Sequence, residues 1–224
     1  MISIGWSLSS LKKHLIKSNH FQLAILQNAN LTQVKFPLSL SEISRLNSKT
    51  NQIAKNQTLA SHYLLKSILG EEHSTNYDMY GRPYIENSDW DISFAHTESI
   101  TATAIIRQPN RVGIDIENLH KTFDEQILIR QAFLPEEKKT IQVLQKAWNL
   151  NEKNSVLALW SLKESFFKAR GGEFSPKNIW IQIEDVNPYK INICENIKNQ
   201  FIPIPTQDVS LQVFEGILLS YCVL

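Results

Sequence analysis

Strand-like and helical segments occur in blocks along this chain instead of alternating one by one. Residues Trp90–His96, Ile100–Ile106 and Val112–Ile116 are rich in β-branched and aromatic side chains, and short polar turns separate them. Each therefore predicts a strand. Helical periodicity both precedes and follows this block. Because the regular strand-helix-strand alternation of a parallel sheet is missing, the order of segments predicts the α+β class.

Helical spacing of apolar residues predicts helices on both sides of these strands. Before them, the segment that follows Ser41 indicates one or two helices ending at Gly70, a residue suited to a C-terminal cap. After them, the expected helices are Phe123–Phe133, Glu136–Leu150 and Ser155–Arg170, the last closed by Gly171 and Gly172. Further strands are expected at Phe21–Leu26, Ile179–Ile183, Tyr189–Ile193, Val209–Phe214 and Ile217–Val223.

Composition and charge exclude several classes of protein. The 224 residues are 42% hydrophobic and 20% charged, which suits a globular protein and not a disordered or fibrous one. The net charge is +1 and neither half forms a basic arm, so we expect no nucleic-acid partner. Cys194 and Cys222 make no disulfide or zinc pattern, which favours the cytoplasm. Met1–Trp6 has no leader pattern and no run of about 18 apolar residues occurs, so we expect no membrane association.

Apolar and acidic residues alternate with a period of two from Gly113 to Glu117. On a strand, the carboxylates of Asp115 and Glu117 then share one face, roughly 6 to 7 Å apart at the backbone. Their oxygens could converge on one cation, and hard oxygen ligands favour Mg²⁺, with Mn²⁺ as an alternative. Taken alone, this pentapeptide is more typical of an amphipathic strand with a solvated acidic face.

Glu164 and Lys168 lie four residues apart within the apolar helical segment Trp160–Ala169. This spacing places them on one helix face, where a simple salt bridge contributes about 0.2 to 0.5 kcal/mol. In the functional alternative, Glu164 supplies a third oxygen ligand and Lys168 reaches a metal-bound phosphate.

His96 is a third candidate, at the end of a predicted strand. A lone histidine in this position is usually structural. If a phosphate binds beside it, His96 can donate a hydrogen bond to an oxygen, with the hydroxyls of Ser93 and Thr97 as further donors.

The order of these motifs resembles the Sfp-type 4′-phosphopantetheinyl transferases of the holo-acyl-carrier-protein synthase superfamily. These enzymes modify the carrier proteins of fatty acid, polyketide and nonribosomal peptide synthesis. Gly81-Arg82-Pro83 is similar to the family's Gly-Lys-Pro, and Ile92–Thr97 to its Phe-Asn-Ile-Ser-His-Ser. Val112–Glu117 resembles its Ile-Gly-Ile-Asp-Ile-Glu, and Leu159–Lys168 its Leu-Trp-Ser-Met-Lys-Glu-Ser-Phe-Ile-Lys. The last two motifs are the specific ones.

The resemblance implies two similar α+β halves, residues 1–110 and 111–224, related by a pseudo-twofold axis, with the active site in the cleft between them. The first half would contact the adenine and 3′-phosphate of coenzyme A. The second would hold the metal site and the catalytic helix. A monomer that acts on an apo acyl or peptidyl carrier protein, with coenzyme A as co-substrate, is expected.

The resemblance also implies a metal site and a mechanism. Asp115, Glu117 and Glu164 would hold Mg²⁺ on the pyrophosphate of coenzyme A, and Lys168 would contact the phosphates and steady the departing 3′,5′-ADP. The carrier serine would attack the β-phosphorus. Its proton would pass to Glu164, to Glu137 or to a metal-bound water, and these alternatives stay open.

Three more residues would contact coenzyme A in this resemblance. Arg82 would border the adenine and 3′-phosphate, His96 would touch phosphate, and Arg45 fits a coenzyme-contacting position. The chain departs from the family pattern at Ala95, where a serine is usual, and at Gln57, where an arginine is common.

Two other functions fit the same residues. A metal-dependent hydrolase of coenzyme A or nucleotide phosphoanhydrides would use the same acidic trio with a water nucleophile. A noncatalytic relative that only binds carrier proteins would keep the fold without the reaction.

Overall fold

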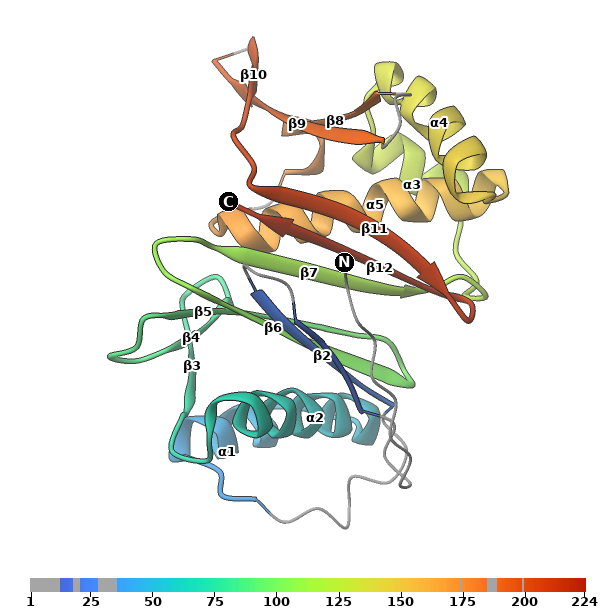
Figure 1. The fold of residues 1–224 in the computed structure, drawn as a ribbon. Coiled ribbons are helices and arrows are strands. Elements are labelled where there is room, and N and C mark those ends of the chain that lie inside the picture. Colours follow the sequence, from blue (N-terminus) through green and yellow to red (C-terminus); the bar gives the residue numbers. More distant parts are fainter. Residues whose placement is uncertain (1–12, 18–20, 28–35, 174, 185–188, 199) are drawn as a thin grey trace.

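Two antiparallel sheets packed face to face form the centre of the protein (Figure 1). The computed structural model describes residues 13–17, 21–27, 36–173, 175–184, 189–198 and 200–224, so Met1–Trp6 lies outside the described residues. The first sheet has the order β1-β2-β6-β5 and the second the order β11-β12-β7. The strands of the first sheet are β1 (Lys13–Lys17), β2 (Phe21–Gln27), β5 (Trp90–His96) and β6 (Ile100–Arg107). Those of the second are β7 (Val112–Asn118), β11 (Asp208–Phe214) and β12 (Ile217–Val223).

Apolar side chains from both sheets fill the space between them. On β7, the alternate residues Val112, Ile114 and Ile116 belong to this core and are at most 2% exposed. The backbone amides of Val112 and Ile114 donate to side chains of β5, which joins the two sheets at this edge. The odd-numbered residues of β7 therefore face the other way.

Helices cover the outer faces of both sheets (Figure 1). On the first sheet lies α2 (Gln52–Leu69), with α1 (Leu40–Asn47) packed against α2. The second sheet is covered by α5 (Glu152–Arg170), with α3 (Glu125–Ala132) and α4 (Lys138–Trp148) packed against that helix. A short 3-10 turn, Pro135–Glu137, leads into α4.

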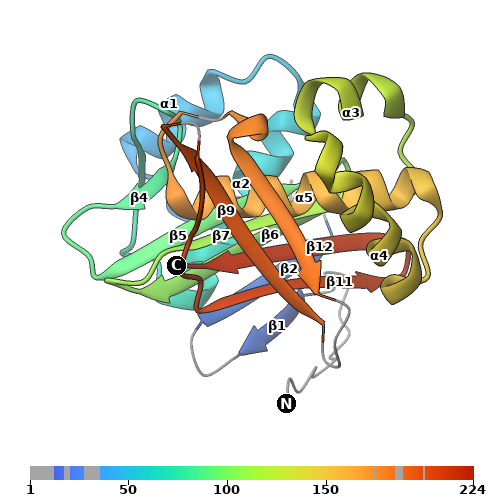
Figure 2. The same ribbon diagram turned by 90° about the horizontal axis from the view of Figure 1, so that it is seen from above.

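Two small sheets complete the structure. The order β10-β9-β8 joins β8 (Ile179–Glu184), β9 (Lys190–Ile197) and β10 (Gln200–Pro203), which cross above the helices of the C-terminal part (Figure 2). The strands β3 (Thr75–Tyr77) and β4 (Pro83–Ile85) pair beside β5.

The α+β class predicted from the sequence is confirmed, and the expected strands and helices form within a few residues of their predicted bounds. Each sheet has its own covering helix, with the chain passing from the first sheet to the second between Arg107 and Val112. The pseudo-twofold axis and the division at residue 110 stay predictions. None of the helices in the described residues combines the length and apolarity needed to cross a membrane.

Candidate active site

Gly113 allows β7 to lie against α5. A methyl group at this position would overlap the carbonyl oxygen of Ser165 and the amide nitrogen of Ala169 on α5. Because backbone atoms cannot move aside as a flexible side chain can, any larger residue would force the strand and helix apart. The next residues on the same face of β7 are Asp115 and Glu117, which are thereby presented to α5.

Asp115 and Lys168 form an ion pair across this contact. Lys168 Nζ lies 2.8 Å from Asp115 Oδ1 and 3.8 Å from Glu164 Oε2 on its own helix. Glu117 pairs with Lys121 at 2.6 Å. Asp115 is only 7% exposed, so the alternative of a solvated acidic face is wrong: this face packs on a helix. The structure thus brings together the four residues that the two specific motifs pointed to.

Asp115, Glu117 and Glu164 form an acidic group, and their carboxylates repel one another. Burial and the charge of Asp115 raise the pKa of Glu117. Burial also raises the pKa of Glu164; Lys168 opposes that shift, and Asp115 and Glu117 add to it. Burial disfavours the ammonium of Lys168, but the charges of Asp115 and Glu164 outweigh burial and raise its pKa. Lys168 is therefore charged at neutral pH.

The acidic group suits a divalent cation in its chemistry. Its oxygens are hard donors, and Asp115 Oδ2 is buried without a hydrogen-bond partner in the described residues. A dication would satisfy that oxygen and relieve the repulsion that raises the pKa values of Glu117 and Glu164. Within the part of the chain that the structure describes, however, no three His, Cys, Asp or Glu side chains are arranged as a set of metal ligands. The metal assignment stays a prediction.

A cavity of about 270 Å³ adjoins this group and shares Lys168 with it. It lies between the C-terminal end of α5 and residues of α1, α2, β4 and β5. Its described lining residues include no carboxylate. Five of its lining side chains are basic or can become so: Arg45, Lys49, Arg82, His96 and Lys168. The cavity is therefore suited to an anion.

The surroundings of two of these basic groups lower their pKa values. Burial and the charge of Arg45 lower the pKa of Lys49. Partial desolvation beside the cavity, with the charges of Lys168 and Lys49, lowers the pKa of His96, so its imidazole is neutral at neutral pH. Positive charge is in excess here, and a bound phosphate would relieve it.

Arg82 lines the cavity but is also an internal link. Its Nη1 and Nη2 donate to the two carboxylate oxygens of Asp91 at 2.9 and 2.8 Å, and its Nε donates to the carbonyl oxygen of Lys168 at 2.9 Å. Asp91 accepts a further hydrogen bond, from the amide of Val112. Arg82 thus connects β5, β7 and the end of α5. The sequence motif located Arg82, but Asp91, a single acid in a strand of apolar neighbours, was missed.

The chain departs from the family pattern at Ala95 and Gln57, and polar side chains at or near these two positions form hydrogen bonds with backbone groups. The hydroxyl oxygen of Ser93 accepts from the amide of Ile114, and that of Thr97 accepts from the amide of Ile100. Gln57 donates to the carbonyl oxygen of Thr97. These side chains therefore help to hold the end of β5 that carries His96.

Glu137 is enclosed in the protein interior. Its side chain is 0% exposed, Oε1 accepts from the amide of Ile181, and Oε2 accepts from the amide of Leu134 and lies 2.6 Å from Lys163 Nζ. A carboxylate held in this way has no access to a carrier serine, so Glu137 is not a candidate base. Lys163 was missed as its partner, although a lysine beside Leu162 on an apolar helix was a usable signal.

Comparison with known proteins places these elements in one family. Residues 111–222 match the family model described as the 4′-phosphopantetheinyl transferase superfamily. The chain is 34% identical over 147 residues to the 4′-phosphopantetheinyl transferase gsp of Aneurinibacillus migulanus. The aligned segment covers 64% of this chain and 55% of that protein. It is 24% identical over 175 residues to the 4′-phosphopantetheinyl transferase HetI of Nostoc sp., covering 73% of this chain and 72% of that protein.

The matched segment contains β7, α5 and the Asp115–Lys168 pair between them. It amounts to half of the chain. The chain therefore belongs to the 4′-phosphopantetheinyl transferase superfamily.

Proposed function

We propose that this protein transfers 4′-phosphopantetheine from coenzyme A to a serine of an apo acyl or peptidyl carrier protein and releases 3′,5′-ADP, as a holo-acyl-carrier-protein synthase does. One observation carries the proposal: Lys168 lines the basic cavity and also pairs with Asp115 of the acidic group. A ligand whose phosphates enter the cavity would thus lie next to the carboxylates. We further propose that the protein acts as a cytoplasmic monomer.

The cavity would bind the phosphates of coenzyme A. Arg45, Lys49 and Lys168 supply positive charge, and neutral His96 can donate one hydrogen bond. Arg82 has two further N–H groups beyond those that bind Asp91 and Lys168. We assign the adenine and 3′-phosphate end to the Arg45 and Arg82 side of the cavity.

The acidic group would hold the metal. Asp115, Glu117 and Glu164 are the ligands that we assign, and Mg²⁺ or Mn²⁺ held there supplies neutralisation of pyrophosphate charge when bound. The orphaned Oδ2 of Asp115 supports this assignment.

Phosphoryl transfer requires positioning, charge stabilisation and one proton acceptor. In the proposed step, the carrier serine oxygen forms a bond to the β-phosphorus, and the bond from that phosphorus to the 3′,5′-ADP oxygen breaks. Glu164, which lies beside Lys168 at the junction of the acidic group and the cavity, takes the serine proton as general base. Lys168 stays beside the departing phosphate. Recognition of the carrier would use its acidic helix against basic and apolar side chains beside the cavity.

The products distinguish this function from its alternatives. With coenzyme A, Mg²⁺ and an apo carrier, the transferase adds about 340 Da to the carrier and releases one 3′,5′-ADP per carrier modified. A phosphoanhydride hydrolase would release phosphopantetheine and leave the carrier unchanged. A noncatalytic carrier-binding protein would bind the carrier and produce neither product. Either of the last two results would contradict the proposal.

A further inference from the structure

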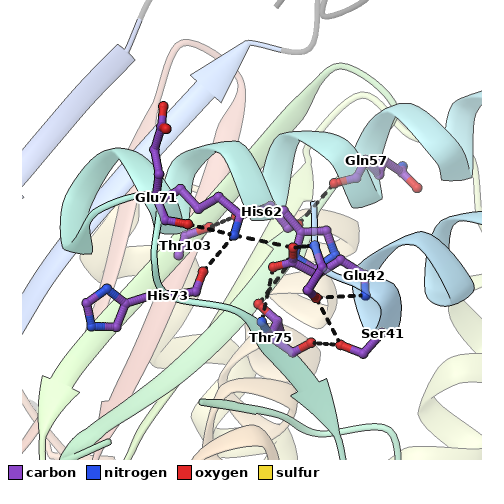
Figure 3. A network of polar contacts seen from close by, with 11 residues as sticks. Ser41, Glu42, Gln57, His62, Glu71, His73, Thr75 and Thr103 are labelled. Carbon is purple, nitrogen blue, oxygen red and sulfur yellow. Dashed lines mark hydrogen bonds and ion pairs between the residues drawn. The ribbon is translucent and has the colours of Figure 1, made fainter. Parts of the chain in front are cut away.

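Three ionisable side chains are buried together next to residues that line the basic cavity, and Figure 3 labels two of them, Glu42 and His62. They are Glu42 of α1 and His62 and Lys66 of α2, whose side chains are 0%, 0% and 3% exposed. Lys66 Nζ lies 3.3 Å from Glu42 Oε2, and His62 Nδ1 lies 3.5 Å from Glu42 Oε1. None of the three lines the cavity itself.

Glu42 ties α1 to β3. Its Oε1 accepts from the amide of Thr75 at 3.0 Å, and its Oε2 accepts from the amide of Ser39 at 2.8 Å. The hydroxyl of Ser41 donates to the carbonyl oxygen of the same Thr75. Figure 3 shows Ser41, Glu42 and Thr75 meeting at this point. The two elements are therefore joined by directional bonds to fixed backbone groups.

The same two elements carry a pair of side chains that line the cavity. Arg45 follows Glu42 by three residues on α1, and Tyr77 follows Thr75 by two on β3. The guanidinium carbon of Arg45 lies 4.4 Å from the centre of the Tyr77 ring, and both residues line the cavity. A shift of α1 against β3 would move Arg45 relative to Tyr77.

His62 and Lys66 support this arrangement from α2. The His62 ring lies edge-on to the rings of Tyr77 and Phe94, two lining residues of the cavity. Burial lowers the pKa of His62 to about 4 despite the charge of Glu42, so the ring is neutral at neutral pH. Lys66 Nζ donates to the carbonyl oxygens of Glu71 and His73, which fixes the turn that leads from α2 into β3.

Glu42 and Lys66 are both charged in this buried cluster, and His62 is neutral. Burial opposes ionisation of Glu42, but the amide hydrogen bonds from Ser39 and Thr75, with the charge of Lys66, outweigh it and lower its pKa. Glu42 is thus a carboxylate whose charge is balanced by Lys66. A buried ion pair of this kind adds little net stability compared with apolar residues, whereas its directional bonds define one geometry. Stability alone therefore does not account for it.

We propose that Glu42, together with His62 and Lys66, is a positioning group that holds Arg45 and Tyr77 in place for the phosphate-bearing ligand of the cavity. The inference rests on the proposed function, because it takes coenzyme A as that ligand. Glu42 itself does not touch the ligand and acts through Arg45.

Calorimetric titration with coenzyme A tests this inference. The variant Glu42→Gln/Lys66→Met removes the ion pair without leaving an unbalanced buried charge. Its Kd for coenzyme A should rise about tenfold, a typical size for indirect coupling. The value of kcat at saturating coenzyme A should stay unchanged, because the acidic group is not altered. An unchanged Kd, or a loss confined to kcat, would overturn the inference.

A double-mutant cycle identifies Arg45 as the residue through which Glu42 acts. Arg45→Ala should weaken coenzyme A binding, and adding Glu42→Gln/Lys66→Met to it should cause little further loss. Fully additive losses would contradict the inference. If Glu42→Gln/Lys66→Met does not fold, Ser41→Ala, which removes only the hydroxyl bound to Thr75, should raise Kd about threefold, and an unchanged Kd would overturn the inference.

Leu144→Ala is the matched control for lost stability. Leu144 is fully buried in α4, whose core lies on the far side of α5 from the first sheet, so its truncation lowers Tm without altering α1 or β3. Its Kd for coenzyme A should equal that of the unaltered protein; an equal rise in both variants would overturn the inference. Failure of the unaltered protein to bind coenzyme A would instead contradict the proposed function.

Discussion

Lys168 Nζ lies 2.8 Å from Asp115 Oδ1, across the contact between α5 and β7. The lysine faces the basic cavity on one side and three carboxylates on the other. Among the residues that the structure describes, its ammonium is therefore the one group that belongs to both parts of the proposed site.

Replacing Lys168 by Met should lower kcat for carrier modification by about 10²- to 10³-fold, the usual loss when one group that stabilises transition-state charge is removed. The side chain is 27% exposed, so the fold should survive. Steady-state rates and circular dichroism check the two statements. Rates within a factor of about two of the unaltered protein would show that Lys168 takes no part in the step.

Replacing Asp91 by Asn should destabilise the protein by about 3 to 5 kcal/mol, because Arg82 would keep a largely buried charge without its bidentate partner. The two side chains are 14% and 9% exposed. Urea unfolding measures the change. The control is Glu184→Gln in the exposed pair with Lys190, which should cost less than about 1 kcal/mol. Equal effects of the two substitutions would contradict the internal role of Arg82.

Replacing Gly113 by Ala should lower both stability and transfer. The added methyl meets the backbone of α5, and overpacking of this kind costs about 1 to 3 kcal/mol. Separation of β7 from α5 would also lengthen the Asp115–Lys168 contact. Unfolding curves and transfer rates should change together; a variant with full activity would show that the close approach is not needed.

Stability should fall as the pH is lowered from about 6.5 to about 4. His62 has an ordinary pKa of 6.5 when unfolded and about 4 when folded, so the unfolded chain binds more protons in this window. Its contribution is complete above the unfolded value and disappears as the pH falls to the folded one, which amounts to about 3 kcal/mol. Urea unfolding across this range should show a weaker pH dependence in His62→Asn. An unchanged dependence would contradict the burial of a neutral His62.

The parts of the site that depend on local spacing could be predicted from the sequence. The period of two in β7 places Asp115 and Glu117 on one face, and the spacing of four in α5 does the same for Glu164 and Lys168. Those relationships hold wherever the strand and the helix form. The spacing could not predict that the strand and the helix contact each other, because that contact requires Gly113 to lie against Ser165.

The contacts between distant segments could not be predicted in this way. Glu42 and Thr75 are 33 residues apart, and their pairing depends on how α1 packs beside β3. The strands β3 and β4 have three residues each, too few to show an alternating pattern. All four residues of β10 are exposed, so its sequence does not need the alternation of apolar and polar residues that marks a half-buried strand. Arg82 was found through its motif, but its link to Asp91 exists only in the folded chain.

The most direct test is the intact mass of an apo carrier protein incubated with coenzyme A, Mg²⁺ and either this protein or its Asp115→Ala variant. Asp115 pairs with Lys168 and carries the orphaned oxygen, so its loss affects both parts of the site. The account predicts that the unaltered protein adds about 340 Da to the carrier, while Asp115→Ala keeps its fold and adds nothing. An unmodified carrier with the unaltered protein, or full modification with Asp115→Ala, would contradict it.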